Sequence, residues 1–118
     1  MSAHNFREMV IWKDSIKMAK SIYTICCEFP TYEKYGIVSQ IQRAAVSISA
    51  NIAEGSGRSS NADFKRFLAM SIGSAYELET LLTLAKEIGY LEEKGYLGVT
   101  EELQYLQKKI YKFNQQLQ

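Results

Sequence analysis

The stretch from Ile37 to Ala53 carries only one charged side chain, Arg43, although 23% of the protein is charged. Placed on a helix at about 100° per residue, it gathers five apolar side chains on one face: Ile37, Ile41, Ala45, Ile48 and Ile52. Beside this face runs a polar stripe, and the remaining surface of the helix carries small apolar side chains. A helix with almost no solvated face is normally buried on all sides. In a chain of 118 residues, one way to bury it is against a second copy.

Two helices are expected in the first half of the chain. One runs from about Arg7 to Glu28 and ends before Pro30, because proline disfavours helical geometry in the residue that precedes it. The next covers roughly residues 37–54. It is broken by the segment Gly55–Ser60, whose two glycines can adopt backbone conformations that other residues avoid.

A third helix is expected to begin near Asn61 and to end at Gly89. Ser60 followed by Asp63 resembles a capping box with aspartate in the glutamate position. Glycine is the residue that most often follows the end of a helix, which places the stop at Gly89. Between these limits a continuous apolar stripe is formed by Phe64, Phe67, Leu68, Ser71, Ala75, Leu78, Leu82 and Ala85.

A fourth helix has the most regular pattern, with apolar residues at alternating spacings of three and four: Leu103, Leu106, Ile110, Phe113 and Leu117. Gly95 and Gly98 would each cost about 1 kcal/mol inside a helix. Propensity therefore predicts a start no earlier than Gly98, with Thr100 at the first turn. Four amphipathic helices without a convincing strand predict one all-α domain over residues 1–118, folded as an antiparallel up-down four-helix bundle.

Composition restricts the class of protein further. The net charge is +1, so no global field draws the chain toward nucleic acid or anionic lipid. The two cysteines, Cys26 and Cys27, are adjacent and favour free thiols in a reducing compartment. No signal peptide or membrane-spanning run is evident, so a soluble, cytoplasmic protein without a membrane partner is expected.

The polar stripe of the second helix consists of Gln40, Arg43, Ser47, Asn51 and Glu54. It could bind a ligand or a partner. We favour a structural role, in which these side chains form an internal hydrogen-bond network with Glu77 and Glu79 of the third helix. Buried polar groups of this kind must be satisfied, and they can fix helix register and the choice of partner.

The glycine-containing turn before the third helix could hold an anion, since free N–H groups, the helix dipole and a guanidinium would converge there. The strand and the Gly-Lys-Ser/Thr ending of nucleotide-binding loops are missing, which favours a simple capped turn. If an anion binds, the residues expected to hold it are Arg58, Lys65 and Arg66.

Two one-sided rows of lysines could contact phosphates. The first consists of Lys13, Lys17 and Lys20, and the second of Lys108, Lys109 and Lys112. Phosphate contacts from such rows would give binding that is independent of sequence and sensitive to salt. In a monomer a solvated face is the favoured interpretation, whereas repetition by symmetry would turn a modest patch into a ring of charge.

Catalysis has little support in the sequence. The only histidine, His4, lies near the terminus, and the Glu-x-x-His motifs of bundle di-metal sites are missing. Cys26 and Cys27 lack an electropositive setting that would activate them. We predict no catalytic residue, no cofactor and no metal, and the tyrosines are spread along the chain.

One set of residues in and just after the second helix forms a recognisable signature: Gln40, Arg43, Ala44, Ser47, Ile48, Asn51, Ile52, Glu54, Gly55 and Arg58. It resembles the signature of the small bundle proteins known as 23S rRNA intervening-sequence proteins. Outside the signature the resemblance continues through Trp12, Phe29, Pro30, Glu33, Tyr35, Gly36, Phe64, Phe67, Leu68, Glu77, Leu78, Gly89 and Tyr90. It implies an antiparallel four-helix bundle, commonly a ring-shaped homopentamer, with no attached enzymatic activity. It also implies a fourth helix that begins near Glu93.

A related accessory protein of diversity-generating retroelements, similar in fold, binds nucleic acid and a reverse transcriptase as a pentamer. The resemblance therefore favours a non-catalytic homo-oligomer that binds RNA, DNA or a ribonucleoprotein through repeated basic patches. The alternative is an adaptor that binds another protein and never touches nucleic acid, which the near-zero net charge favours. In either case we expect small residues to contribute to the interfaces between copies: Ala50, Ala53, Gly73 and Ser74.

Overall fold

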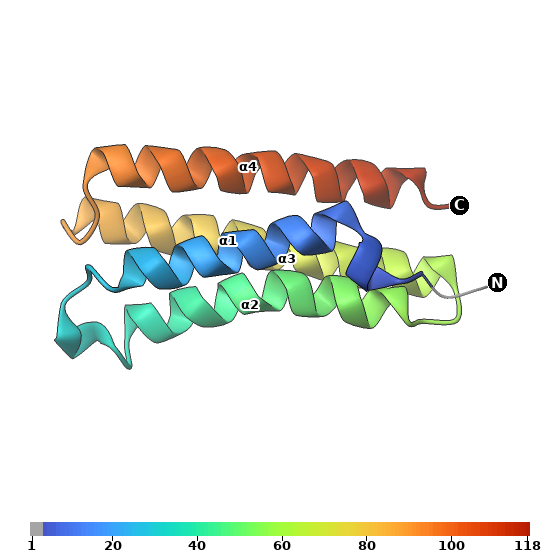
Figure 1. The fold of residues 1–118 in the computed structure, drawn as a ribbon, viewed down its shortest axis with the longest axis horizontal. Helices are drawn as coiled ribbons and strands as arrows, with labels where there is room; N and C mark the ends of the chain where they lie inside the picture. The colour runs from blue at the N-terminus through green and yellow to red at the C-terminus, as the bar shows by residue number, and fades with distance from the viewer. Residues whose placement is uncertain (1–3) are drawn as a thin grey trace.

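The computed structural model describes residues 4–118 and contains four α-helices, with no strand in that range. They are α1 (Val10–Cys26), α2 (Ile37–Ser56), α3 (Asn61–Glu87) and α4 (Glu93–Gln116). Two single-turn 3₁₀ helices, Phe6–Glu8 and Thr31–Glu33, precede α1 and α2. The four α-helices lie side by side along the 48 Å axis of the molecule, and the described part of the chain begins and ends at the same end (Figure 1).

The core lies between the helices and consists of the apolar faces that the sequence pattern predicts. Each helix contacts the next along the chain, and α4 returns to contact α1. Ile41, Ile48 and Ile52 of α2 are fully buried, as are Leu78 and Leu82 of α3. The 3.6-residue period therefore identified the inward faces correctly.

Within a single chain, the second helix is buried on its inward face only. Its inward face is buried, but Arg43, Val46 and Ala50 are exposed on the outer surface. Val46 retains 44% of its accessible surface. The outer surface of α2 is therefore a weakly polar strip in the single chain, and its burial against a second copy stays a prediction.

The turn between α2 and α3 depends on close packing more than on unusual glycine conformations. Gly55 and Gly57 both have ordinary backbone conformations, and Gly89 is the one described residue with a positive φ, of 90°. A Cβ atom on Gly55 would lie 2.7 Å from Cβ of Phe67 and 2.8 Å from Cδ1 of Phe64. Glycine is needed at this position because α3 passes directly against the end of α2.

The cap of α3 is only half of the expected capping box. The Ser60 hydroxyl accepts a hydrogen bond of 3.1 Å from the backbone N–H of Asp63, as the sequence predicts. The Asp63 carboxylate does not return to Ser60, because it pairs with two arginines. The glycine at the other end behaves as expected, and Gly89 follows directly after the last turn.

The fourth helix begins at Glu93, so the start that the resemblance implied is correct and the start deduced from glycine propensity is wrong. Gly95 and Gly98 both lie within the first turns, exposed to solvent. Val99 and Thr100 are buried, and Tyr96 packs against the core. Packing of this segment outweighs a propensity cost of about 1 kcal/mol per glycine.

Candidate functional site

The two lysine rows lie on neighbouring helices. Lys13, Lys17 and Lys20 are all exposed on α1. On α4, the ammonium group of Lys109 pairs with the carboxylate of Asp14, so this member of the second row lies beside α1. Lys108 instead lines the hollow between α3 and α4. We call the surface formed by Lys13, Lys17 and Lys20 of α1 with Lys109 and Lys112 of α4 the lysine face.

Acidic side chains interrupt part of the lysine face. Lys17 lines a hollow of about 120 Å³ together with Asp14 and Glu102. Lys20 lines a second hollow, of about 330 Å³, with Glu28 and Glu102. Two lysines of this face line neither hollow and take part in no ion pair with another described residue: Lys13 at the start of α1 and Lys112 at the end of α4. Both are exposed. The start of α1 and the end of α4 lie toward the same end of the molecule (Figure 1).

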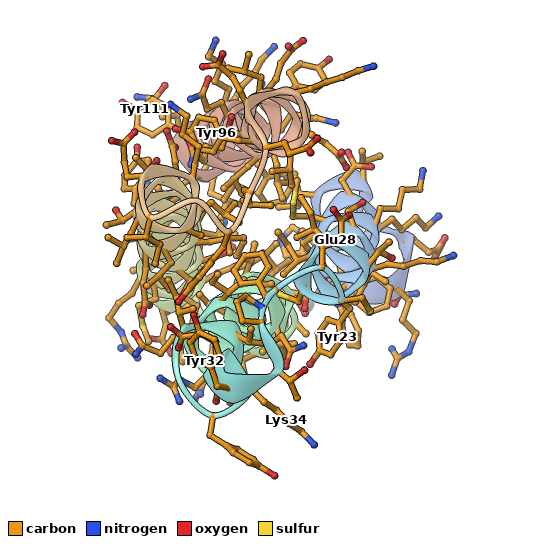
Figure 2. The ribbon with its side chains drawn as sticks, turned by 90° about the vertical axis from the view of Figure 1, so that its left-hand side faces the viewer. Tyr23, Glu28, Tyr32, Lys34, Tyr96 and Tyr111 are labelled. Carbon is orange, nitrogen blue, oxygen red and sulfur yellow. The ribbon has the colours of Figure 1, made fainter. Side chains whose placement is uncertain are left out.

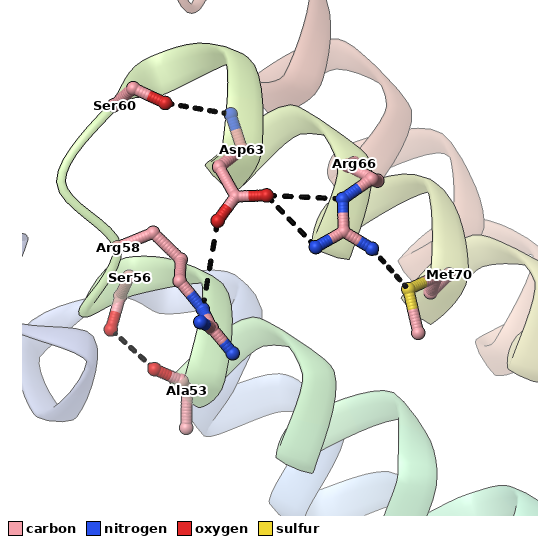
Figure 3. A network of polar contacts seen from close by, with 7 residues as sticks. All are labelled: Ala53, Ser56, Arg58, Ser60, Asp63, Arg66 and Met70. Atoms are coloured by element: carbon pink, nitrogen blue, oxygen red, sulfur yellow. Dashed lines mark hydrogen bonds and ion pairs between the residues drawn. The ribbon is translucent and has the colours of Figure 1, made fainter.

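The three residues expected to form an anion site do not come together. Asp63 pairs with Arg66 at 2.9 Å and with Arg58 at 3.8 Å, so its carboxylate offsets both guanidinium groups (Figure 3). Both guanidinium groups also lie over the ring of Phe67. Lys65 is directed elsewhere, and its ammonium donates to the carbonyl oxygen of Leu117 at 3.4 Å. The turn is an ion-paired cap in which no cluster of free cations assembles.

The polar stripe of α2 divides into two parts. Gln40, Arg43 and Glu54 are exposed, and only Ser47 and Asn51 are partly buried. Asn51 donates to the carbonyl and the hydroxyl of Ser47, at 2.9 and 3.0 Å. The Ser47 hydroxyl lies 2.8 Å from that of Ser74 on α3. The stripe therefore does contact α3, but through serines only.

Neither glutamate predicted to join this stripe does so. Glu77 is exposed, and Glu79 faces the opposite neighbour, where it accepts hydrogen bonds from Gln104 and Gln107 of α4. Both residues lie on α3 as predicted, but Glu79 pairs with α4 instead of α2 and Glu77 is exposed to solvent. Periodicity fixes which residues share a face of one helix, and it does not say which neighbour that face meets.

The loops at the end opposite the termini are held by a small polar cluster. Tyr90 donates a hydrogen bond of 2.8 Å to the carboxylate of Glu33, and the hydroxyls of Tyr90 and Tyr32 lie 3.2 Å apart. These hydrogen bonds, with Tyr32 first and Glu33 second, hold the pKa of Tyr90 above its usual value. The other oxygen of Glu33 accepts from the backbone N–H of Ile37 at 3.4 Å and thus caps α2. These hydrogen bonds join the two loops, and their role is structural.

The remaining reactive side chains are the two adjacent cysteines and His4. Both cysteines are free, with Cys26 buried and Cys27 exposed. Burial, together with the neighbouring Cys27, raises the pKa of Cys26 to about 11. His4 packs against the ring of Phe64. Across residues 4–118, no three of the His, Cys, Asp and Glu side chains are grouped in a way that could hold a metal ion.

A groove between α3 and α4 was not anticipated from the sequence. It is lined by Tyr76 and Tyr111, which are half exposed, and by the Glu79 carboxylate with its two glutamine partners. The tyrosines are far apart in the chain, and no sequence signal links them. Among the described helices, none has both the length and the apolar character required to cross a membrane.

Comparisons with known proteins agree with this architecture. A crystal structure of a protein of unknown function from Bacteroides thetaiotaomicron, of the S23 ribosomal protein family, is similar to this chain with a TM-score of 0.80. The two sequences are 25% identical, and the match covers 89% of this chain and 98% of that one. No curated protein matches the chain. The family described as 23S rRNA-intervening sequence protein matches residues 7–112, almost the whole length, and the chain therefore belongs to that family.

Proposed function

We propose that this protein is a non-catalytic homo-oligomer, built from antiparallel up-down four-helix bundles, that binds nucleic acid through basic patches repeated by symmetry. The observation that carries the proposal is the lysine face, where lysines of α1 and α4 lie side by side. A row of lysines contacts phosphates without regard to sequence. A ring of five copies, the number implied by the resemblance to the bundle proteins, would repeat the face five times. Two free cysteines agree with action in the cytoplasm.

Assembly is supported by the outer surface of α2 and α3. Val46 and Ala50 of α2 are exposed, and so are Met70 and Gly73 of α3. Gly73 lies in the middle of a helix with nothing within 4 Å of the position of a Cβ atom, although glycine there costs about 1 kcal/mol relative to alanine. A weakly polar strip with small residues at its centre suits close approach by the helix of another copy.

The first test measures the mass of the particle and its affinity for nucleic acid in the same buffers. Light scattering at low and moderate salt gives the number of chains in the particle, and fluorescence anisotropy with labelled duplex DNA and RNA gives affinity across the same salts. The proposal predicts several chains per particle and a steep, linear fall of log affinity with log salt. A monomer, or a particle that binds no nucleic acid even at low salt, would overturn it.

A double variant tests whether nucleic acid binds to the lysine face. Lys13→Gln combined with Lys112→Gln is expected to weaken binding and to reduce the salt slope by about one for each phosphate that is no longer neutralised. Lys34→Gln is the matched control, because Lys34 is exposed at the opposite end of the molecule (Figure 2). Equal slopes for the double variant and the control would place binding away from the lysine face.

The second candidate function is a protein-binding adaptor. It is favoured by the carboxylates of Glu28 and Glu102, which lie among the lysines of α1 and reduce the positive charge there. An oligomer that shows no affinity for either duplex at low salt would favour this function over the first.

A further inference from the structure

A groove runs along the outer surface between α3 and α4. Its main part has a volume of about 430 Å³ and is lined by Tyr76, Glu79, Gln104, Gln107, Lys108 and Tyr111. A second hollow of about 360 Å³ shares Tyr76 and Glu79 and extends along α3 past Thr80 and Thr83. The groove is separate from the lysine face, since it lies on the α3 side of α4 and that face lies on the α1 side.

Within the groove a carboxylate is held in a fixed orientation. The Nε2 atom of Gln107 donates to Oε1 of Glu79 at 2.9 Å, and that of Gln104 donates to Oε2 at 3.0 Å. Each carboxylate oxygen can accept a second hydrogen bond, and each glutamine retains its carbonyl oxygen as an acceptor. The groove therefore offers a preorganised set of acceptors to a ligand that brings donors.

Two aromatic rings border these acceptors. Tyr76 is 57% exposed and Tyr111 is 55% exposed, so each presents a ring surface to solvent. The hydroxyl of Tyr111 accepts a hydrogen bond of 2.9 Å from Gln115, one turn further along α4, which restricts the orientation of the ring. Tyr111 lies at the outer edge of the molecule (Figure 2).

We propose that this groove binds an unpaired nucleobase of single-stranded nucleic acid and prefers bases that carry an exocyclic amino group. A base presents flat faces that stack on tyrosine rings, and such stacking tolerates every base. Its amino group is a donor for the Glu79 carboxylate, as in the pairing of glutamate with N4 of cytosine. Lys108 at the rim is within the same groove and supplies a positive charge for the adjoining phosphate.

The inference rests on the proposed function, because it assumes that the protein binds nucleic acid. It goes beyond that function in assigning base recognition to a surface other than the lysine face. Phosphate contacts weaken steeply with salt, whereas stacking and hydrogen bonds to a base edge do not depend on counterion release. The groove therefore adds a component of binding that persists at moderate salt and requires an unpaired strand.

The test compares labelled oligocytidylate, oligouridylate and an RNA duplex by fluorescence anisotropy, with strands of about 12 nucleotides, a length that such sites span. At moderate salt, oligocytidylate is expected to bind about tenfold more tightly than oligouridylate, because uracil has a carbonyl where cytosine has its amino group. Tyr111→Ala is expected to weaken binding of oligocytidylate by about tenfold. Tyr111→Phe keeps the ring and should retain most of the affinity.

Two further variants test whether a loss of affinity arises from the groove itself. Glu79→Gln should remove the preference for cytosine over uracil, since it replaces the charged acceptor. Tyr35→Ala is the matched control: Tyr35 is 88% exposed and precedes α2, away from the groove. Circular dichroism of each variant checks that the helices are intact.

The outcomes distinguish this inference from the proposed function. Salt-sensitive binding of all three nucleic acids, unchanged by Tyr111→Ala and Glu79→Gln, would overturn base binding in the groove. It would leave the proposed role of the lysine face unaffected. Absence of binding to all three, even at low salt, would overturn both. Weaker affinity for single strands alone in Tyr111→Ala, with duplex binding retained, would support the groove.

Discussion

Ser71 of α3 donates a hydrogen bond of 2.8 Å from its hydroxyl to the backbone carbonyl oxygen of Ile48 on α2, and both residues are fully buried. One turn further along α3, the hydroxyl of Ser74 lies 2.8 Å from that of Ser47 on α2. Two polar contacts therefore fix the axial position of α3 against α2 across an otherwise apolar interface. Small serine side chains at these positions also allow the helices to approach closely.

Ser71→Ala is expected to lower the free energy of unfolding by about 1 kcal/mol, the typical net contribution of one intramolecular hydrogen bond. The cost is moderate because the variant removes the donor and leaves no polar side chain buried without a partner. Urea denaturation followed by circular dichroism measures it. Ser59→Ala, at an exposed position in the α2–α3 turn, is the control and should unfold as the parent does. Equal midpoints for both variants would contradict the role of this contact.

Gly55→Ala is expected to destabilise the protein by about 1–3 kcal/mol through overpacking. The added methyl group would lie within 3 Å of Phe67 Cβ and Phe64 Cδ1, and a Cβ atom cannot rotate away from the contact. The matched control is Gly57→Ala, where the nearest atom outside the adjacent residues is 3.7 Å away. Thermal denaturation of the two variants should therefore separate them clearly. A melting temperature of Gly55→Ala equal to that of Gly57→Ala would show that α3 can move away from α2 without cost.

The helices and their inward faces could be predicted because both depend on local information. Ile41, Ile48 and Ile52 share a face at helical spacing, and all three are fully buried. The start of α4 could not be predicted in this way, since Gly95 and Gly98 act against a helix locally. Burial of Val99 beneath that segment decides the outcome, and burial is a property of the tertiary structure.

The candidate sites, too, could be predicted from the sequence only where they depend on local information. Periodicity placed lysines on α1 and α4, but it could not show that Lys109 faces Asp14 of α1 while Lys108 lines the α3–α4 groove, or that Glu102 lies beside Lys17. Asp63 was expected to act as a cap, and its pairing with two arginines depends on the fold of the turn. The α3–α4 groove had no local signal at all, because Tyr76 and Tyr111 meet only through the packing of their helices.

The two thiols are expected to differ in reactivity. In the native protein an aromatic disulfide reagent should modify one thiol per chain, Cys27, because Cys26 is buried with a pKa raised to about 11. Cys27→Ser should abolish the fast reaction, and Cys26→Ser should keep it. Both thiols of the parent should react after unfolding in urea. Fast modification of two thiols per native chain would contradict the burial of Cys26.

The same raised pKa predicts how stability depends on pH. The native state holds the Cys26 proton more tightly than the unfolded state, whose thiol titrates near the usual value of 9.0. This contribution to the free energy of unfolding is therefore complete below pH 9 and is lost as the pH rises toward about 11. Urea denaturation at successive pH values measures it, and Cys26→Ala should show a shallower decline over that window. Identical declines for parent and variant would assign the change to other groups.

Ala50→Glu tests the assembly surface most directly. Ala50 is exposed on the outer side of α2, and a glutamate there costs a single chain little because it remains in water. If another copy covers this position, the variant buries an unpaired charge and the oligomer dissociates. Light scattering should then give a smaller mass while circular dichroism remains that of a helical protein. Ala62→Glu is the control, since Ala62 is exposed in the first turn of α3, where a negative charge suits the helix dipole. An unchanged mass for Ala50→Glu would show that the interface lies outside the exposed surface of α2. Dissociation in that variant alone would show that the interface includes this surface.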